Sequence, residues 1–213
     1  MTFDDVKFAI YLAVALLPSL VLHEYAHAYA ADKLGDPTPR RWGRLSLHPN
    51  PLIDPFGSVI LPGLILLLVA AGQGFVLPIF AYAKPMPLDP TYLRNRKRDS
   101  LIVVLAGPAA NLALAAVAGA VIRTGLGGEV GLLVLAFLYV NVFMFVFQFM
   151  PVPGLDGAKL LARVLPPRPR EVYVSLDQYL VLFMLVIFFL LAGPLLGIVR
   201  SLADVLFSLL AGT

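Results

Sequence analysis

The sequence contains no cysteine and few charged residues. Among its 213 residues there are three His and one Trp, and only 14% are Asp, Glu, Lys or Arg. Without cysteine the chain can form no disulfide framework, no thiolate metal site and no cysteine nucleophile. Soluble domains carry about 25% charged residues, so this chain has too little polar surface for a water-soluble globule. Any metal site must therefore use imidazole and carboxylate ligands.

Apolar residues take the place of the missing polar ones. They make up 60% of the chain, and the mean hydropathy is +0.87. Since about 20 apolar residues span a bilayer, the pattern predicts an all-α polytopic membrane protein with about five or six transmembrane helices. The final candidate is short, so it is either an amphipathic surface helix or the end of a sixth span. The candidate spans are Phe8–Ala31, Gly57–Gly72, Leu101–Ile122, Val130–Met150, Tyr179–Val199 and Ser201–Leu210.

The chain has no internal repeat and no low-complexity tract, and we expect a single membrane domain over residues 1–213. Its core would cover residues 8–165, and its C-terminal helices residues 176–213. The first residues include two aspartates and only one base, Lys7, so the basic region of a cleaved signal peptide is missing. We therefore expect the first span to be retained.

Two short segments between the first and the later spans have extended character. Arg44–Ser46 and Phe75–Tyr82 have Pro and Gly on either side, which is typical of strands. In a membrane protein such backbone must be buried in protein or line a wet cavity. We expect a short β-hairpin or strand that dips into the membrane here, with an interfacial loop as the alternative.

The strongest chemical signal lies in the first apolar segment, which contains His23-Glu24-Tyr25-Ala26-His27. Two histidines four residues apart share one face of a helix and can bind one ion. Glu24 is placed to act as a general base on a metal-bound water. Ionisable groups inside an apolar helix are functional candidates, although polar residues at an interfacial helix end are the alternative. The motif predicts a metal site with His23 and His27 as ligands.

A catalytic zinc ion usually takes three protein ligands, so a third is needed. Asp54 lies in an Ile-Asp-Pro turn, where aspartate often bonds its own backbone. Asp89 lies beside a basic loop, and His48 lies in a Pro-rich loop that could approach the metal. Asp156 follows an apolar span that prolines and glycines interrupt, which is a usual way to build a site inside a bilayer. We therefore favour Asp156 as the third ligand.

Several motifs together resemble one known family. The His-Glu-x-x-His of the first span occurs with Gly107-Pro108-Ala109-Ala110-Asn111 and with Leu155-Asp156-Gly157. This combination resembles the site-2 protease family of intramembrane zinc metalloproteases. The runs Leu34-Gly35-Asp36-Pro37-Thr38 and Ala83-Lys84-Pro85-Met86-Pro87 are similar to its small bacterial branch, which lacks PDZ and CBS domains.

The resemblance implies a function and a set of site residues. It implies hydrolysis of peptide bonds within or near transmembrane segments of membrane-protein substrates, with one zinc ion held by His23, His27 and Asp156. Glu24 would be the general base and acid. The family often has Asn eight positions before the ligand aspartate, where this chain has Gln148. Gln148, Asn111 and His48 are candidates for supporting the substrate or the active site, although Asn111 could instead cap a helix start.

A common metal also constrains the direction of the spans. If the His motif and Asp156 meet, the first and fourth spans must run the same way, so segment 57–82 either re-enters or returns through the membrane. This arrangement puts 13 of the 16 basic residues on one side, which the positive-inside rule places in the cytosol. We expect a multi-pass cell-membrane protein with its N-terminus outside and its zinc nearer the cytosolic face. The 13 residues are Lys33, Arg40, Arg41, Arg44, Lys84, Arg94, Arg96, Lys97, Arg98, Lys159, Arg163, Arg168 and Arg170.

The basic run at 94–98 and the His pair each allow another interpretation. The basic run at 94–98 could bind nucleic acid, but a cluster beside anionic lipid is the expected role, so we predict no nucleic-acid partner. The His pair could instead serve a metal-ion transporter. A transport path needs ionisable residues along several spans, and Leu101–Ile122 and Val130–Met150 contain no charged residue. This favours a protease that acts on a transmembrane substrate in the lipid bilayer.

Overall fold

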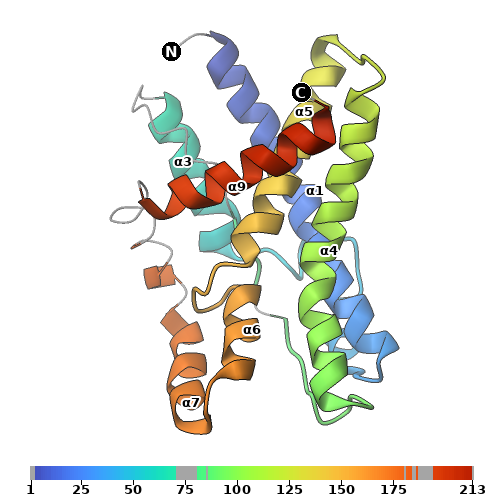
Figure 1. The fold of residues 1–213 in the computed structure, drawn as a ribbon, viewed down its shortest axis with the longest axis vertical. Coiled ribbons are helices and arrows are strands. Elements are labelled where there is room, and N and C mark those ends of the chain that lie inside the picture. The colour runs from blue at the N-terminus through green and yellow to red at the C-terminus, as the bar shows by residue number, and fades with distance from the viewer. Residues whose placement is uncertain are drawn as a thin grey trace.

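The computed structural model describes residues 3–70, 81–84, 86–179, 181–183, 186 and 194–212. Within these residues the regular elements are all helical (Figure 1), which confirms the α class. The element η1 is a π-helix and η2 a 3-10 helix. In chain order the elements are α1 (Phe3–Lys33), α2 (Thr38–Arg41), η1 (Pro55–Ile60), α3 (Leu61–Ala70), α4 (Arg96–Ile122), α5 (Gly128–Gln148), α6 (Asp156–Val164), α7 (Pro167–Ser175), η2 (Leu176–Tyr179) and α9 (Pro194–Ala211).

Three of the described helices are long and apolar enough to cross a membrane. They cover Lys7–Lys33 in α1, Arg96–Ile122 in α4 and Gly128–Gln148 in α5, and they match three of the predicted spans. About half of the predicted span Tyr179–Val199 lies outside the described residues. The coarse expectation of a helical membrane protein is therefore confirmed, and the count of five or six spans stays a prediction.

The three long helices pack against one another and form the core. Small side chains stand at their contacts, including Ala15 on α1, Ala115 on α4 and Ala136 on α5, each almost fully buried. Small residues let helix backbones approach closely, which is how helices gain packing energy where lipid removes the hydrophobic drive. The bundle thus has a tightly packed interior in which polar groups need partners from neighbouring helices.

The directions of these helices agree with a common site. In Figure 1, α1 and α5 run the same way, and α4 runs beside them in the opposite direction. Between α1 and α4, segment 57–82 begins and ends at the same place, because the backbone N–H of Tyr82 donates to Gly57 O at 3.2 Å. The convergence that the sequence analysis required for His23 and Asp156 is therefore present.

The predicted strand at Arg44–Ser46 is not found. Arg44 instead closes a turn after α2, with its N–H donating to Pro39 O at 2.8 Å, and Gly43 takes a positive φ of 67°. Most of Phe75–Tyr82 lies outside the described residues. Ala83, directly after this segment, forms an isolated antiparallel bridge with Ile53, and the predicted hairpin is unconfirmed.

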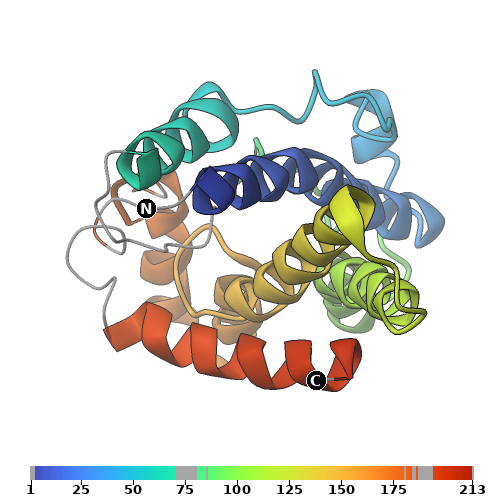
Figure 2. The same cartoon turned by 90° about the horizontal axis from the view of Figure 1, so that it is seen from above.

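The last helix, α9, lies across α5 and α4 instead of alongside them (Figures 1 and 2). Its inner side buries Val199 and Ala203 against the bundle. Its end is held by the Arg123 side chain, whose Nε donates to Leu210 O at 2.9 Å. The predicted segment Ser201–Leu210 is therefore part of a longer helix that crosses the bundle.

One end of the molecule gathers basic side chains. It is the end where α1 finishes, α4 begins and α6 and α7 lie (Figure 1), and we call it the basic end. The N-terminus of α1, the α4–α5 turn and α9 lie toward the other end. Basic residues of the helices at the basic end are Lys33, Arg96, Lys97, Arg98, Lys159, Arg163, Arg168 and Arg170.

Candidate metal centre

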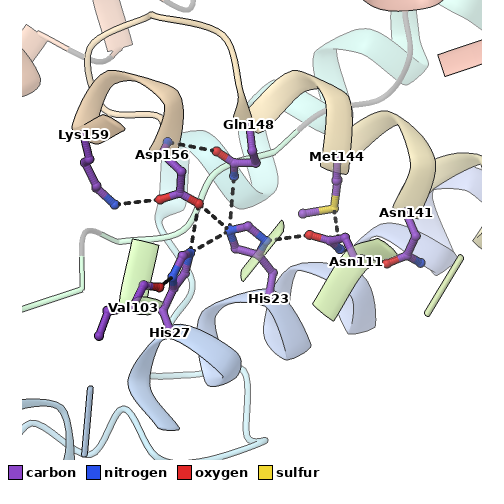
Figure 3. Close-up of polar contacts among 9 residues, drawn as sticks. All are labelled: His23, His27, Val103, Asn111, Asn141, Met144, Gln148, Asp156 and Lys159. Carbon is purple, nitrogen blue, oxygen red and sulfur yellow. Dashed lines mark hydrogen bonds and ion pairs between the residues drawn. The ribbon is translucent and has the colours of Figure 1, made fainter. Parts of the chain in front are cut away.

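Three side chains from two distant parts of the chain meet inside the bundle. His23 and His27 come from α1, and Asp156 is the first residue of α6 (Figure 3). The two Nε2 atoms are 3.0 Å apart. Asp156 Oδ2 lies 3.0 Å from His27 Nε2 and 3.3 Å from His23 Nε2. All three residues are buried, at 1%, 4% and 3% exposure.

The outer nitrogens of both imidazoles have oxygen partners that fix the ring tautomers. His23 Nδ1 lies 2.5 Å from Asn111 Oδ1, and His27 Nδ1 lies 2.7 Å from the carbonyl oxygen of Val103. Both oxygens are acceptors, so each Nδ1 carries the donated proton. Each Nε2 lone pair is then directed into the cluster, which is the form in which histidine binds a metal.

A line of buried polar side chains supports His23 from behind. Asn111 Nδ2 donates to Asn141 Oδ1 at 2.8 Å, and Asn141 Nδ2 donates to Ser19 Oγ at 2.9 Å. The Ser19 hydroxyl donates to Ala15 O at 2.8 Å. Asn111, Asn141 and Ser19 are fully buried. Because every donor points away from His23, Asn111 Oδ1 is left to accept the imidazole proton.

At Gly107, α4 presents only its backbone to the two imidazoles. A Cβ at Gly107 would lie 2.2 Å from His27 Nε2 and 2.7 Å from His23 Nε2. No side chain fits at that distance. Glycine at this position therefore allows α4 to pack directly against the two imidazoles.

The loop that carries Asp156 is fixed by close packing and by contacts at its rim. A Cβ at Gly157 would lie 2.3 Å from Phe149 O, so glycine allows the loop to fold back on the end of α5. Tyr173 Oη donates to Pro151 O at 2.7 Å, and the N–H of Gly154 donates to Asp177 Oδ1 at 2.8 Å. The α7–η2 segment thus holds the loop from outside.

Gln148 and Lys159 complete the surroundings of Asp156. Gln148 Nε2 lies 3.4 Å from His23 Nε2, and Gln148 Oε1 accepts from the Asp156 N–H at 3.4 Å. Lys159 Nζ donates to Asp156 Oδ1 at 2.9 Å, which leaves Oδ2 facing the histidines (Figure 3). Gln148 therefore reaches both sides of the cluster despite its extra methylene relative to Asn.

The donor set fits a zinc ion. Tetrahedral zinc has ligand bonds of about 2.0–2.1 Å, which places two ligand atoms about 3.3 Å apart. The three observed separations, 3.0, 3.0 and 3.3 Å, are close to this value. Two lone pairs and a carboxylate oxygen that converge in a buried site also repel one another unless a cation lies between them. Among the described residues, His23, His27 and Asp156 form the group of His, Asp or Glu side chains whose ligand atoms lie close enough together to hold one metal ion.

The other candidates for a third ligand have local roles. His48 is exposed, and its Nδ1 accepts from Asn50 N at 3.4 Å, so the loop does not bring it to the cluster. Asp89 Oδ1 accepts from the Thr91 hydroxyl at 2.6 Å and from the Thr91 N–H at 2.9 Å, and these bonds lower the pKa of the Asp89 carboxyl. His48 is therefore not one of the clustered ligands, and a supporting role for it at the active site stays a prediction.

Asp54 begins the π-helix η1. Its Oδ1 accepts from the N–H groups of Phe56 at 3.0 Å and Gly57 at 2.7 Å, as the turn motif predicts. Asp54 is therefore a helix cap.

Replacing Asp54 with alanine tests this assignment. Loss of the cap is expected to lower the free energy of unfolding by about 1 kcal/mol, measured by thermal unfolding of the purified protein in detergent. Bound zinc, measured by mass spectrometry, is expected to stay at the wild-type level. Loss of zinc with an unchanged melting temperature would identify Asp54 as a ligand instead.

Glu24 lies next to the cluster by sequence, one residue after His23 on α1. Its side chain is half-buried. A carboxylate beside the ligands, and separate from them, is suited to move a proton at the site.

Comparison with known proteins identifies the chain's relatives. "Putative zinc metalloprotease YwhC" of Bacillus subtilis is 30% identical over 192 residues, which cover 84% of this chain and 80% of the relative. "Putative zinc metalloprotease Rip2" of Mycobacterium tuberculosis is 33% identical over 195 residues, covering 88% and 71% of the two chains. The chain belongs to the site-2 protease family of zinc metalloproteases.

A third relative is also named as a zinc metalloprotease, which agrees with the metal ligands of the centre. Rip2 of Mycolicibacterium smegmatis is 33% identical over 178 residues, covering 76% of this chain and 60% of the relative. No family model and no solved structure matches the chain. The relatives support zinc as the cofactor, and the buried cluster of His23, His27 and Asp156 provides a site for it.

Several residues of the centre were not singled out from the sequence. Gly107 was only part of a motif, and the sequence gives no sign that its missing side chain makes room for the imidazoles. Asn141 and Ser19 are single polar residues in apolar helices, which is a signal for an interhelical hydrogen bond. That signal could have found them, although not their common link to His23.

Proposed function

We propose that this protein is an intramembrane zinc metalloprotease that hydrolyses peptide bonds within or beside a substrate's transmembrane segment. His23, His27 and Asp156 would hold one zinc ion, and Glu24 would be the general base and acid. The observation that carries the proposal is the burial of this cluster among three helices able to cross a membrane. His23 lies ten residues before Lys33, the last residue of α1, a rise of about 15 Å along the helix, so the proposal puts the cluster below the lipid headgroups on the side of the basic end.

The catalytic roles follow from chemistry and position. Zinc in this site would supply Lewis-acid chemistry that activates water and polarises the scissile carbonyl. Glu24 accepts the proton of the attacking water and then donates it to the leaving amine. Asn111 and the Val103 carbonyl hold the two imidazoles in the orientation that presents Nε2.

The substrate must change conformation before it is cut. Peptide carbonyls in a helix are hydrogen-bonded and shielded, so a transmembrane helix must unwind at the cleaved bond. The side-chain amide of Gln148 lies close to His23 and to the Asp156 backbone. From this position the amide would contact an unwound substrate chain at the centre. The basic end would face the cytosol, because cytosolic loops collect Lys and Arg.

A reconstitution experiment tests the proposed function. The purified protein in proteoliposomes is given a single-span substrate, and the cut bond is mapped by mass spectrometry. We expect the cut within the apolar segment or next to it, loss of cleavage to background with a zinc chelator, and recovery on adding zinc. Cuts confined to the water-exposed flanks, or cleavage that resists complete zinc removal, would contradict the proposal.

A further inference from the structure

A hollow of about 330 Å³ lies beside the metal centre at the basic end. It is lined by α4, α6, α7, the 3-10 helix η2 and the loop before α4. Val104 of α4 and Ala158 of α6 form buried parts of its wall. Tyr173 of α7 and Pro90, in the loop before α4, also line it. The hollow is therefore set between elements of the protein itself.

The hollow adjoins the centre at Lys159. Lys159 lines the hollow and donates to Asp156 Oδ1 at 2.9 Å. Figure 3 shows Lys159 on the side of Asp156 that faces away from His23 and Asn111. Val104, another lining residue, directly follows Val103, whose carbonyl binds His27. An extended peptide advances about 3.3 Å per residue, so a chain cut at the centre reaches the hollow within a few residues.

The charges of the lining favour an anionic occupant. Lys159, Arg163 and Arg170 are cationic, and Asp177 is the one carboxylate among the lining residues. Lys159 is paired with Asp156, so the positive charge left to attract a ligand comes from Arg163 and Arg170. Arg163 binds neutral oxygens, the Ser100 hydroxyl at 2.8 Å and the carbonyl of Lys97, so its charge is not neutralised there. Asp177 already accepts the Gly154 N–H. The excess positive charge would attract a negative group.

We propose that this hollow binds the part of the substrate that continues from the cleaved bond toward the basic end, and that it selects acidic side chains there. The inference rests on the proposed function, and it adds a substrate preference. A peptide is favoured over a lipid headgroup because apolar wall residues such as Pro90 and Val104 accompany the cations, and because the hollow continues from the centre itself.

Charge reversal at Arg170 tests the proposal. The full-length Glu24→Gln variant in nanodiscs binds labelled single-span model peptides whose flank at the basic end carries two Glu, two Gln or two Lys. We expect the Glu peptide to bind about tenfold more tightly than the Lys peptide, and Arg170→Glu to reverse this order. Arg168→Glu is the matched control, because it makes the same charge change on α7 outside the hollow.

The outcomes separate this inference from the proposed function. Equal affinity for the three peptides, or equal effects of Arg168→Glu and Arg170→Glu, would overturn the inference. A preference seen only in nanodiscs containing phosphatidylglycerol would also overturn it, in favour of a lipid site. Cleavage of the Gln peptide by the wild-type protein is measured in parallel. Absence of that cleavage counts against the proposed function, and the binding order decides the inference independently.

Discussion

Replacing Glu24 with glutamine is expected to reduce cleavage of a single-span substrate about a thousandfold, with zinc still bound at the wild-type level. Glutamine has nearly the shape of glutamate, but its amide cannot accept the proton of the attacking water. The ligands His23, His27 and Asp156 are unchanged by this substitution, so their separations and the metal affinity should be kept. Cleavage is measured in proteoliposomes, and zinc by mass spectrometry.

A matched variant controls for loss of charge. Glu171→Gln makes the same change on the exposed surface of α7, and we expect it to leave cleavage and zinc content unaltered. If Glu24→Gln cleaved at the wild-type rate, the protease mechanism would be wrong. A metal transporter would instead move zinc with or without the Glu24 carboxylate, so zinc uptake into the same vesicles discriminates the two functions.

Replacing Gly107 with alanine is expected to lower zinc affinity about a hundredfold or more. The new methyl group would lie 2.2 Å from His27 Nε2 and 2.7 Å from His23 Nε2, so either α4 or both imidazoles must move. Overpacking of this kind costs about 1–3 kcal/mol, and here the displaced atoms are the metal-binding nitrogens themselves. Zinc affinity is measured by competition with a chromophoric chelator.

Gly119 provides the control on the same helix. A Cβ at Gly119 would lie 2.7 Å from Leu210 O of α9, so Gly119→Ala also overpacks α4, but far from the centre. We expect both variants to have lower melting temperatures and only Gly107→Ala to lose zinc affinity. Equal zinc affinities in the two variants would show that the centre tolerates a side chain at position 107.

The long helices could be predicted from hydropathy because their apolar runs exceed the thickness of a bilayer. Leu101–Ile122 and Val130–Met150 correspond to α4 and α5 within a few residues at most ends. The first charged turn of α4 was missed, since Asn95 caps the helix by accepting from the Arg98 N–H at 3.1 Å. A hydropathy profile detects the apolar part of a helix and does not detect a first turn made of basic residues.

The meeting of His23, His27 and Asp156 was also predictable, because two ligands at i and i+4 need a third and an interrupted helix offered one. The Arg44–Ser46 strand was not found, because Gly43 and the contact from Arg44 to Pro39 make a turn there. Short extended segments carry little periodicity, so propensity alone does not decide their pairing.

The hydrogen-bonded line from His23 through Asn111 and Asn141 to Ser19 also bears on assembly. Helices enter a membrane separately and then associate, and inside lipid an amide without a partner has no water to bind. Sliding α5 by one turn would separate Asn141 from both Asn111 and Ser19 at once. The amide line therefore selects a single register for the three helices, and the chain can complete its metal site only after that register has formed.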